Sequence, residues 1–212
     1  MPTLLHIDSS LMGEASLSHR LTKEFAQQWR NANPHGRVIA RDLARNKIPV
    51  IDAAWVFANQ TPKPSRTPEQ NNLLALSDEF LQELFDADEY VLGVPMYNWG
   101  PSSSFKLWLD QTLRFGETIL NTASGPKGTL DRKRATFIIT AGATYTPGSP
   151  SAALNYLEPW LRTYFGYLGI QSMHFLLADG AINVLQGKID REAFLTPHLE
   201  TIQSLFAGAL SV

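Results

Sequence analysis

The sequence predicts an α/β fold, a doubly wound five-stranded parallel sheet with helices on both faces. Short apolar runs alternate with segments whose apolar residues recur at helical spacing, and parallel strands covered on both faces have such continuous apolar runs. The chain has 212 residues, of which 44% are hydrophobic, so it can bury one sizeable core. We therefore expect a single domain over residues 1–212.

The first strand and the first helix are separated by a serine-rich loop. Residues 3–7 form an apolar run that indicates a buried strand, and an amphipathic helix opens at Ser18, which we expect to cap it. Residues 37–42 have strand character. The two strands and the helix between them therefore form a β-α-β unit.

A capping signal predicts the next helix. Thr67 is a good N-cap residue, Pro68 suits the first helical position, and Gln70 completes the pattern three residues after the cap. Residues 89–94 then form a central strand. The apolar residues that follow the cap at helical spacing are Leu73, Leu76, Phe80, Leu81 and Leu84.

The second half of the chain repeats this alternation. Strands are expected at residues 135–140 and 173–178, and helices at residues 103–114, 152–165 and 189–210. Each strand thus has a helical connection to the next one, as parallel pairing requires.

Three loops should meet at one edge of this sheet. Ligands of doubly wound sheets bind outside the carboxyl ends of the strands, where the strand order reverses. The loops that leave those ends begin at Ser9, Pro95 and Ala141, and all three are rich in small, hydroxyl or amide residues. We expect one composite site there. Two longer inserts, residues 46–66 and 115–134, are expected to be lids, partner surfaces or poorly ordered segments.

The first loop suits a phosphate monoester. At a helix N-terminus, unsatisfied N–H groups and the helix dipole attract an anion, and the hydroxyls of Ser10, Ser16 and Ser18 add donors. The chain has neither the Gly-x-Gly-x-x-Gly nor the Gly-x-x-x-x-Gly-Lys-Ser/Thr motif, which argues against a Rossmann-type dinucleotide and a nucleoside triphosphate. Because serines also cap helices and form turns, this loop alone leaves both interpretations open.

The second loop favours a flavin. Met96 and Trp99 offer polarizable and planar apolar surface, and Asn98 offers both a donor and an acceptor. An isoalloxazine ring needs apolar contact along its faces and hydrogen bonds along its polar edge. The alternative is a core loop whose aromatic residues simply pack.

These residues resemble the family of FMN-dependent NADH azoreductases, also described as quinone reductases, which has the flavodoxin-like fold. The motif is Pro95-Met96-Tyr97-Asn98-Trp99 followed by Ser103, Lys106 and Asp110, and the similarity covers nearly the whole chain. The other matching segments are, in order, Ser9-Ser10 with Ser16 and Ser18, Gln28-Trp29-Arg30, Arg41-Asp42-Leu43, Ile48-Pro49-Val50, Leu76-Ser77-Asp78-Glu79, Gly125-Pro126 with Gly128, Pro159-Trp160-Leu161 and Gly166-Tyr167-Leu168-Gly169-Ile170.

The resemblance implies a homodimer with FMN at the subunit interface, reduced by NADH or NADPH and reoxidised by quinones or azo compounds. We expect a two-electron ping-pong reaction, because a single ring face walled by bulky residues has little room for both substrates. The implied cofactor-binding residues are Ser10, Ser16, Leu17 and Ser18 for the phosphate, Met96, Tyr97, Asn98 and Trp99 for the ring, and Ala141, Gly142, Ala143 and Thr144 in the third loop.

Two aspects of the resemblance concern individual residues. The family's third loop typically reads Ser-Arg-Gly-Gly, whereas this chain has Ala141-Gly142-Ala143-Thr144, so only contacts from backbone N–H groups can survive there. Tyr167 and Phe165 fall where the family places an aromatic side chain of the partner subunit over the flavin, which makes them candidate substrate-binding residues.

Composition argues against several other classes of protein. A net charge of −2 provides no general field for nucleic acid or an anionic membrane. The absence of cysteine excludes disulfides and thiolate chemistry, and with no signal peptide or membrane-spanning run we expect a cytoplasmic protein. His6 and His174 lack a spaced partner, so we expect both to pack rather than bind a metal. No catalytic acid, base or nucleophile is assigned.

Two other functions stay open. A flavodoxin-type electron carrier would share the fold and FMN, but such carriers usually have a strongly acidic docking face, and 18 Lys and Arg against 20 Asp and Glu argue mildly against one. A serine hydrolase using Ser10 or Ser149 lacks the Gly-x-Ser-x-Gly motif.

Overall fold

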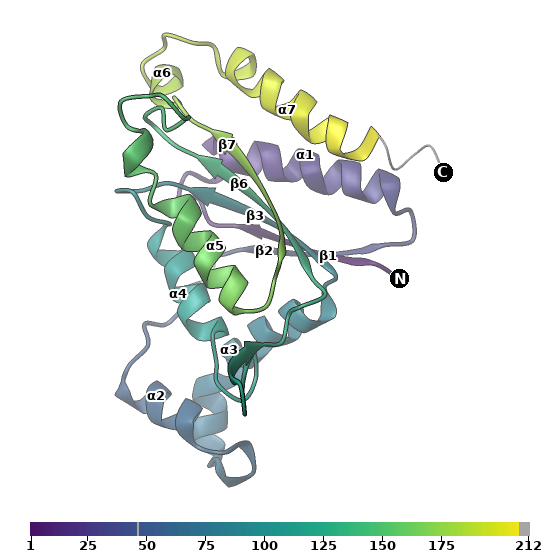
Figure 1. Cartoon of the computed structure of the whole chain (residues 1–212), viewed down its shortest axis with the longest axis vertical. Coiled ribbons are helices and arrows are strands. Elements are labelled where there is room, and N and C mark those ends of the chain that lie inside the picture. Colours follow the sequence, from purple (N-terminus) through teal and green to yellow (C-terminus); the bar gives the residue numbers. More distant parts are fainter. Residues whose placement is uncertain (46, 208–212) are drawn as a thin grey trace.

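The computed structural model describes residues 1–45 and 47–207 and is built around a five-stranded parallel sheet. The strand order is β2-β1-β3-β6-β7, so the order reverses between β1 and β3 (Figure 1). The fold class is therefore confirmed, and each strand lies within one residue of its predicted range. The strands are β1 (Thr3–Asp8), β2 (Arg37–Asp42), β3 (Glu89–Pro95), β6 (Arg134–Thr140) and β7 (Ser172–Ala178).

Five helices cover the two faces of the sheet. Helices α1 (Leu17–Ala32) and α7 (Arg191–Ala207) lie on one face. Helices α3 (Pro68–Asp86), α4 (Ser103–Thr112) and α5 (Leu157–Tyr167) lie on the other (Figure 1). Within the described residues, no helix is long and apolar enough to span a membrane.

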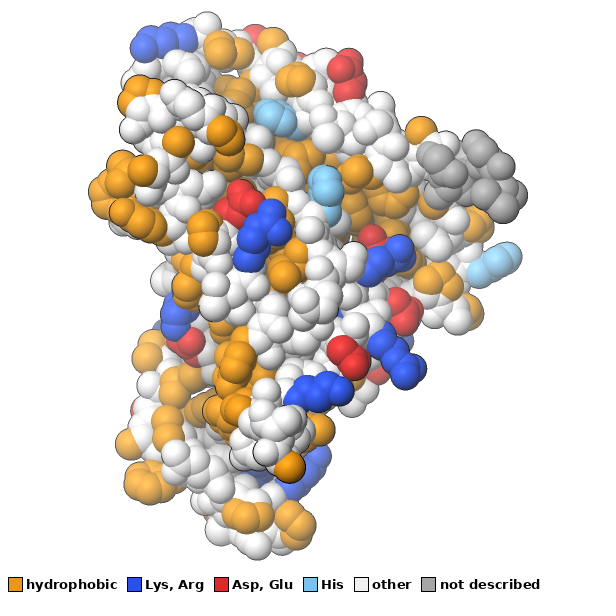
Figure 2. All heavy atoms as spheres, in the orientation of Figure 1, with side chains coloured by type: hydrophobic (Ala, Val, Ile, Leu, Met, Phe, Trp, Pro, Cys, Tyr) orange, Lys and Arg blue, Asp and Glu red, His pale blue; other side chains and the backbone are white. Residues whose placement is uncertain are grey.

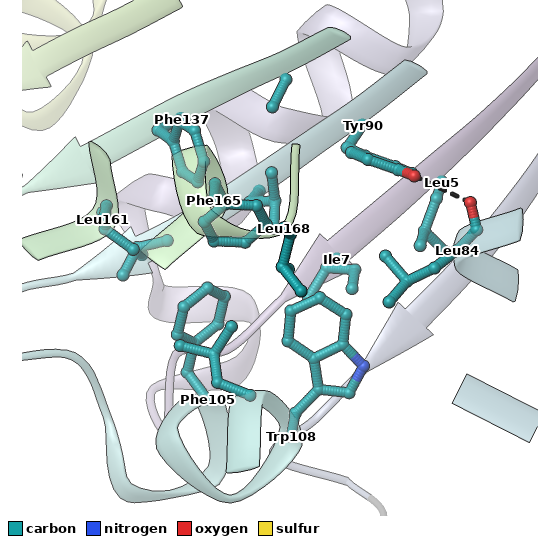
Figure 3. Packing of buried hydrophobic residues seen from close by; sticks show 14 of the residues in the cluster. Leu5, Ile7, Leu84, Tyr90, Phe105, Trp108, Phe137, Leu161, Phe165 and Leu168 are labelled. Carbon is teal, nitrogen blue, oxygen red and sulfur yellow. Dashed lines mark hydrogen bonds between the residues drawn. The ribbon is translucent and has the colours of Figure 1, made fainter. Parts of the chain in front are cut away.

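Alternation along the strands divides the core into two clusters. Leu5 and Ile7 of β1 face α3, α4 and α5, whereas Leu4 faces α1 and α7. In the larger cluster, Trp108 of α4 and Phe165 of α5 are buried beneath the sheet (Figure 3). Both faces of the sheet are therefore occupied by apolar side chains, as its continuous apolar strands predict.

The predicted capping box of α3 is confirmed. The Thr67 hydroxyl accepts a hydrogen bond from the Gln70 N–H at 3.3 Å, and the Gln70 side chain accepts one from the Thr67 N–H at 3.0 Å. One position of the predicted apolar face is wrong, because Leu74 is fully buried while Leu73 is 43% exposed. Leu74 packs against α2 (Ala53–Gln60), an element that the apolar spacing did not predict.

Three predicted helices have different boundaries. The helix expected at 103–114 ends at Thr112. The segment expected at 152–165 begins as a 3₁₀ turn (Ala152–Leu154), and α5 starts after Asn155, whose side chain accepts a hydrogen bond from the Glu158 N–H at 3.3 Å. The last helix begins at Arg191 rather than 189 because Asp190 accepts hydrogen bonds from the next N–H groups. Its predicted end, residues 208–210, lies outside the described residues.

The two long inserts contain structure of their own. Residues 47–66 contain α2 and a 3₁₀ turn (Lys63–Ser65), and residues 115–134 contain a hairpin of β4 (Ile119–Thr122) and β5 (Gly125–Gly128). Helix α2 and the start of α3 form an arm that extends away from the sheet, and hydrophobic side chains are exposed on it (Figures 1 and 2).

A buried arginine fastens this arm to the domain. Arg114 follows α4 and is fully buried. Its guanidinium donates to Asn59 Oδ1 on α2 at 2.8 Å, to Ser77 Oγ at 3.0 Å and to Asp78 Oδ1 on α3 at 2.5 Å. Arg114 thus links α2 and α3 to the segment that follows α4.

Candidate functional site

The first loop leaves two free N–H groups at the start of α1. Ser16, not Ser18, is the N-cap, because its backbone is extended and its hydroxyl accepts a hydrogen bond from the His19 N–H at 3.2 Å. The capping prediction for Ser18 is wrong; that side chain is fully buried, with its Oγ 3.0 Å from Ser16 Oγ. The N–H groups of Leu17 and Ser18 have no acceptor among the described residues. This helix end can therefore receive an anion.

The second loop contains a strained tight turn. Asn98 and Trp99 have φ angles of 48° and 64°, in the left-handed region, and Tyr97 and Gly100 exchange backbone hydrogen bonds of 2.8 and 3.0 Å across them. Asparagine tolerates this conformation, but a tryptophan there costs roughly 1–2 kcal/mol. The turn leaves Trp99 51% exposed beside the carboxyl end of β3. Such strain is typical of functional sites.

The third loop pairs through its carbonyl groups with the segment that follows β7. The carbonyls of Ala141, Gly142 and Ala143 accept hydrogen bonds from the N–H groups of Ala181, Ile182 and Gly180 at 2.9, 3.0 and 3.1 Å. The N–H groups of residues 142, 143 and 144, by contrast, have no acceptor in the described part of the chain. The departure from Ser-Arg-Gly-Gly thus removes side chains but leaves three free backbone donors.

The three loops enclose one hollow of about 270 Å³, at the edge predicted for the site. Ser10 Oγ lies 3.5 Å from Tyr97 Oη and links the first loop to the second. The walls between the polar loop ends are mainly apolar. Seven of the twelve predicted cofactor-binding residues line the hollow, namely Ser10, Ser16, Leu17, Met96, Tyr97, Ala141 and Gly142.

The other five predicted cofactor-binding residues do not line this hollow. Ser18 is buried behind the cap, and Asn98 and Trp99 lie in the exposed turn. Ala143 and Thr144 are exposed further along the third loop, although their N–H groups are free. These residues are close in sequence to the lining residues, but they would contact only a part of the ligand that extends beyond the hollow.

One lining segment was not predicted, and two residues of the predicted first loop were not named as cofactor-binding residues. Ala181 and Leu185 come from the start and end of the short helix α6 (Ile182–Leu185) after β7, and Met12 and Ala15 come from the first loop. Apolar residues such as these have no chemical signature, and a four-residue helix is too short to show a period. Only the pairing of this segment with the third loop brings it to the site.

The two candidate substrate-binding residues of α5 differ in their exposure to solvent. Phe165 is completely buried, with its ring centroid 4.8 Å from that of Phe137, so no ligand can reach it and the prediction is wrong (Figure 3). Tyr167 is 42% exposed and, with Trp160 and Tyr164, lines a separate hollow of about 350 Å³. Tyr167 therefore stays a candidate, on a surface apart from the three loops.

An acidic side chain beside the first loop lies next to two histidines. His6 Nε2 lies 3.2 Å from Asp8 Oδ2, His19 Nε2 lies 4.0 Å from Oδ1, and the Thr22 hydroxyl donates to Oδ1 at 2.7 Å. Burial raises the pKa of Asp8, but these contacts outweigh it and hold the pKa below its usual value. No arrangement of three His, Cys, Asp or Glu suited to a metal ion occurs among the described residues.

A larger hollow, of about 570 Å³, lies at the opposite end of the sheet between α1 and α7. It includes His174, which is exposed rather than buried as its strand pattern predicted, because α7 leaves the start of β7 uncovered. Ligands of doubly wound sheets bind at the carboxyl ends of the strands, so the hollow between the three loops is the better candidate site.

Comparisons with known proteins agree with this geometry. Residues 2–204 match the profile of a family described as having the flavodoxin-like fold. The chain is 57% identical over 204 residues to FMN-dependent NADH:quinone oxidoreductase 3 of Burkholderia lata, covering 96% of this chain and 99% of that protein. It is 44% identical to an FMN-dependent NADH:quinone oxidoreductase of Acidobacterium capsulatum, covering 98% of this chain and all of that protein (100%).

Solved structures share the fold. An FMN-dependent NADH-azoreductase from Bacillus anthracis, crystallised in complex with FMN, superposes with a TM-score of 0.85. The match covers 98% of this chain and 99% of that one at 21% identity, which establishes similarity of fold.

Proposed function

Since this chain belongs to the family of FMN-dependent NADH:quinone oxidoreductases, whose fold is flavodoxin-like, we propose that it transfers electrons from NADH or NADPH to quinones and azo compounds through FMN bound between its three loops. One observation carries the proposal. Free backbone donors stand at both polar ends of a single hollow whose remaining walls are apolar. A flavin mononucleotide has the matching pattern, with a phosphate at one end and an apolar ring with one polar edge at the other.

The residues present fit FMN. The Ser16 hydroxyl and the free N–H groups of Leu17 and Ser18 would hold the phosphate at the positive end of α1. Met96 and Tyr97 would contact the ring, and the free N–H groups of residues 142–144 would bind its polar edge. When bound, FMN would supply hydride acceptance from the nicotinamide and electron transfer to the acceptor. The protein then contributes position and fixed dipoles, which favour negative charge at that edge.

The same features support a homodimer. A hollow of about 270 Å³ is smaller than the roughly 300–1,000 Å³ of pockets that enclose a ligand, so one chain would leave part of FMN uncovered. Tyr167 and Trp160 offer aromatic surface on α5 that a second copy could use to complete the site. Light scattering should give a dimer at micromolar concentration, and an FMN-loaded monomer would contradict this part of the proposal.

Spectroscopy and kinetics test the proposed reaction. The purified protein should have the visible absorption of a flavin and oxidise NADH when a quinone is added, which would separate an enzyme from an electron carrier that needs a protein partner. Initial rates against NADH concentration at several quinone concentrations should give parallel lines in reciprocal plots. Intersecting lines would mean that both substrates bind together, contrary to a ping-pong order.

A further inference from the structure

Asp179 directly follows β7, and its carboxylate faces the third loop. Its Oδ2 atom accepts hydrogen bonds from the N–H groups of Tyr145 at 2.5 Å and Thr146 at 2.9 Å. No cation pairs with this carboxylate among the described residues. Its two backbone bonds are therefore its main stabilising contacts in the described chain.

The third loop is consequently held from two sides by one segment. The N–H groups of residues 180–182 bind the carbonyls of residues 141–143, and Asp179 binds the N–H groups of the next two peptide units after Thr144. The groups left between these contacts are the N–H groups of residues 142, 143 and 144. Residues 179–182 therefore make hydrogen bonds on both sides of the free N–H groups of the site.

The side chains of residues 141–144 do not fix this shape. Residues 141–143 are Ala, Gly and Ala, and they are followed by Thr144, whose side chain forms no hydrogen bond in the described structure. Gly142 has nothing within 4 Å of the position of a Cβ atom, so no packing restrains it there. Apart from the Ser149 hydroxyl, which donates to the Thr144 carbonyl at 2.8 Å, the contacts that orient the free N–H groups come from residues 179–182.

We propose that Asp179 is a positioning residue that holds residues 141–146 in the conformation in which the N–H groups of residues 142–144 bind the polar edge of the flavin. The inference rests on the proposed function and deepens it. In this role Asp179 acts through the loop and does not itself touch the cofactor. The small side chains of the loop are tolerated because its shape is imposed by a residue 38 positions after Ala141.

The acceptor role and the charge of Asp179 can be separated. Both bonds go to one oxygen atom, and the side-chain carbonyl of asparagine also has two lone pairs, so Asp179→Asn can keep both bonds without the charge. His198 of α7 lies close enough to sense this charge: burial lowers the pKa of His198, and Asp179 partly opposes that shift. A role based on charge would fail in the asparagine variant, whereas a role based on hydrogen bonding would survive.

Three variants of the full chain test the proposal. Asp179→Ala removes the acceptor, Asp179→Asn retains it, and Asp52→Ala is the control, because the Asp52 carboxylate also accepts a backbone hydrogen bond, from the Trp55 N–H at 2.8 Å, but does so at the start of α2. For each we would measure FMN affinity by titrating the apoprotein, the reduction potential of bound FMN, and the melting temperature of the apoprotein.

Asp179→Ala should weaken FMN binding by about tenfold or more, as expected when oriented hydrogen bonds are lost, and should lower the potential of bound FMN. Asp179→Asn should restore the affinity and potential of the parent, and Asp52→Ala should lower only the melting temperature. Parent-like affinity and potential in Asp179→Ala would overturn the inference, as would an equal loss of affinity in Asp52→Ala. Failure of the parent itself to bind FMN would overturn the proposed function and this inference with it.

Discussion

Replacing Asp78 with alanine should destabilise the protein more than replacing Arg114 with methionine, although Arg114 makes more hydrogen bonds. The Arg114 side chain is fully buried, whereas the Asp78 side chain is 40% exposed. Asp78→Ala therefore leaves a buried cation without a carboxylate, and Arg114→Met lets the carboxylate return to water. Both changes break the same ion pair, but one leaves a buried charge and the other leaves a partly exposed charge.

The structure gives a magnitude for each change. For Asp78→Ala we expect a loss of about 3 kcal/mol in the free energy of unfolding, the low end for a broken buried pair, because the guanidinium keeps Asn59 and Ser77. For Arg114→Met we expect about 1–2 kcal/mol, because Ser77 Oγ still donates to the Gln111 carbonyl at 2.6 Å. That variant also removes Arg114 Nη2, which has no hydrogen-bond partner in the described chain.

Urea unfolding of the FMN-free proteins would measure these values, because bound ligand adds its own stabilisation. The double variant should resemble Arg114→Met alone, since no buried charge then remains. Glu79→Ala on the same helix is the control; its side chain is 58% exposed, so its ion pair with Arg41 should contribute less than about 1 kcal/mol. The reasoning is refuted if Arg114→Met is as destabilising as Asp78→Ala or more so.

Three further predictions concern the site and its surroundings. Ser16→Ala removes the N-cap of α1, so thermal unfolding of the apoprotein should show a loss of about 1 kcal/mol, and FMN titration should show weaker binding; unchanged values in both would contradict the cap assignment. Asn98→Leu places a branched side chain at a φ of 48° and removes the amide, so potentiometry should give a lower flavin potential and stopped-flow a slower reduction by NADH, whereas parent-like values would make Asn98 a turn residue only. Burial lowers the pKa of His198 below 6.5, so the stability that its neutral form contributes is present above pH 6.5 and is lost as the pH falls through the folded pKa. The free energy of unfolding, measured in urea, should therefore fall less over that pH interval in His198→Gln than in the parent.

The sequence by itself determined the strands, the main helices and the edge of the sheet at which the site lies. These depend on local signals, such as the apolar run at residues 89–94 and the Thr67–Gln70 capping box, whose physics involves only a few neighbouring residues. The meeting of the three loops could also be predicted, because the carboxyl ends of parallel strands share an edge. Ser10, Met96 and Ala141 therefore line one hollow although they are far apart in the chain.

Tertiary structure alone decided which neighbouring residues face the site. Phe165 and Tyr167 are two positions apart on α5, and only the contact of Phe165 with Phe137 makes one a core residue and the other a surface residue. In the same way, Ser16 rather than Ser18 became the cap because of the backbone conformation at the start of α1.

The partners of the third loop were equally beyond the reach of the sequence. Asp179, Ala181 and Leu185 follow a different strand, and no local pattern connects them with residues 141–146. The pairing of β6 with β7 places the two segments side by side, and hydrogen bonds between distant backbone groups then fix the loop. Such contacts depend on distances between elements, which a periodic pattern of residue types does not encode.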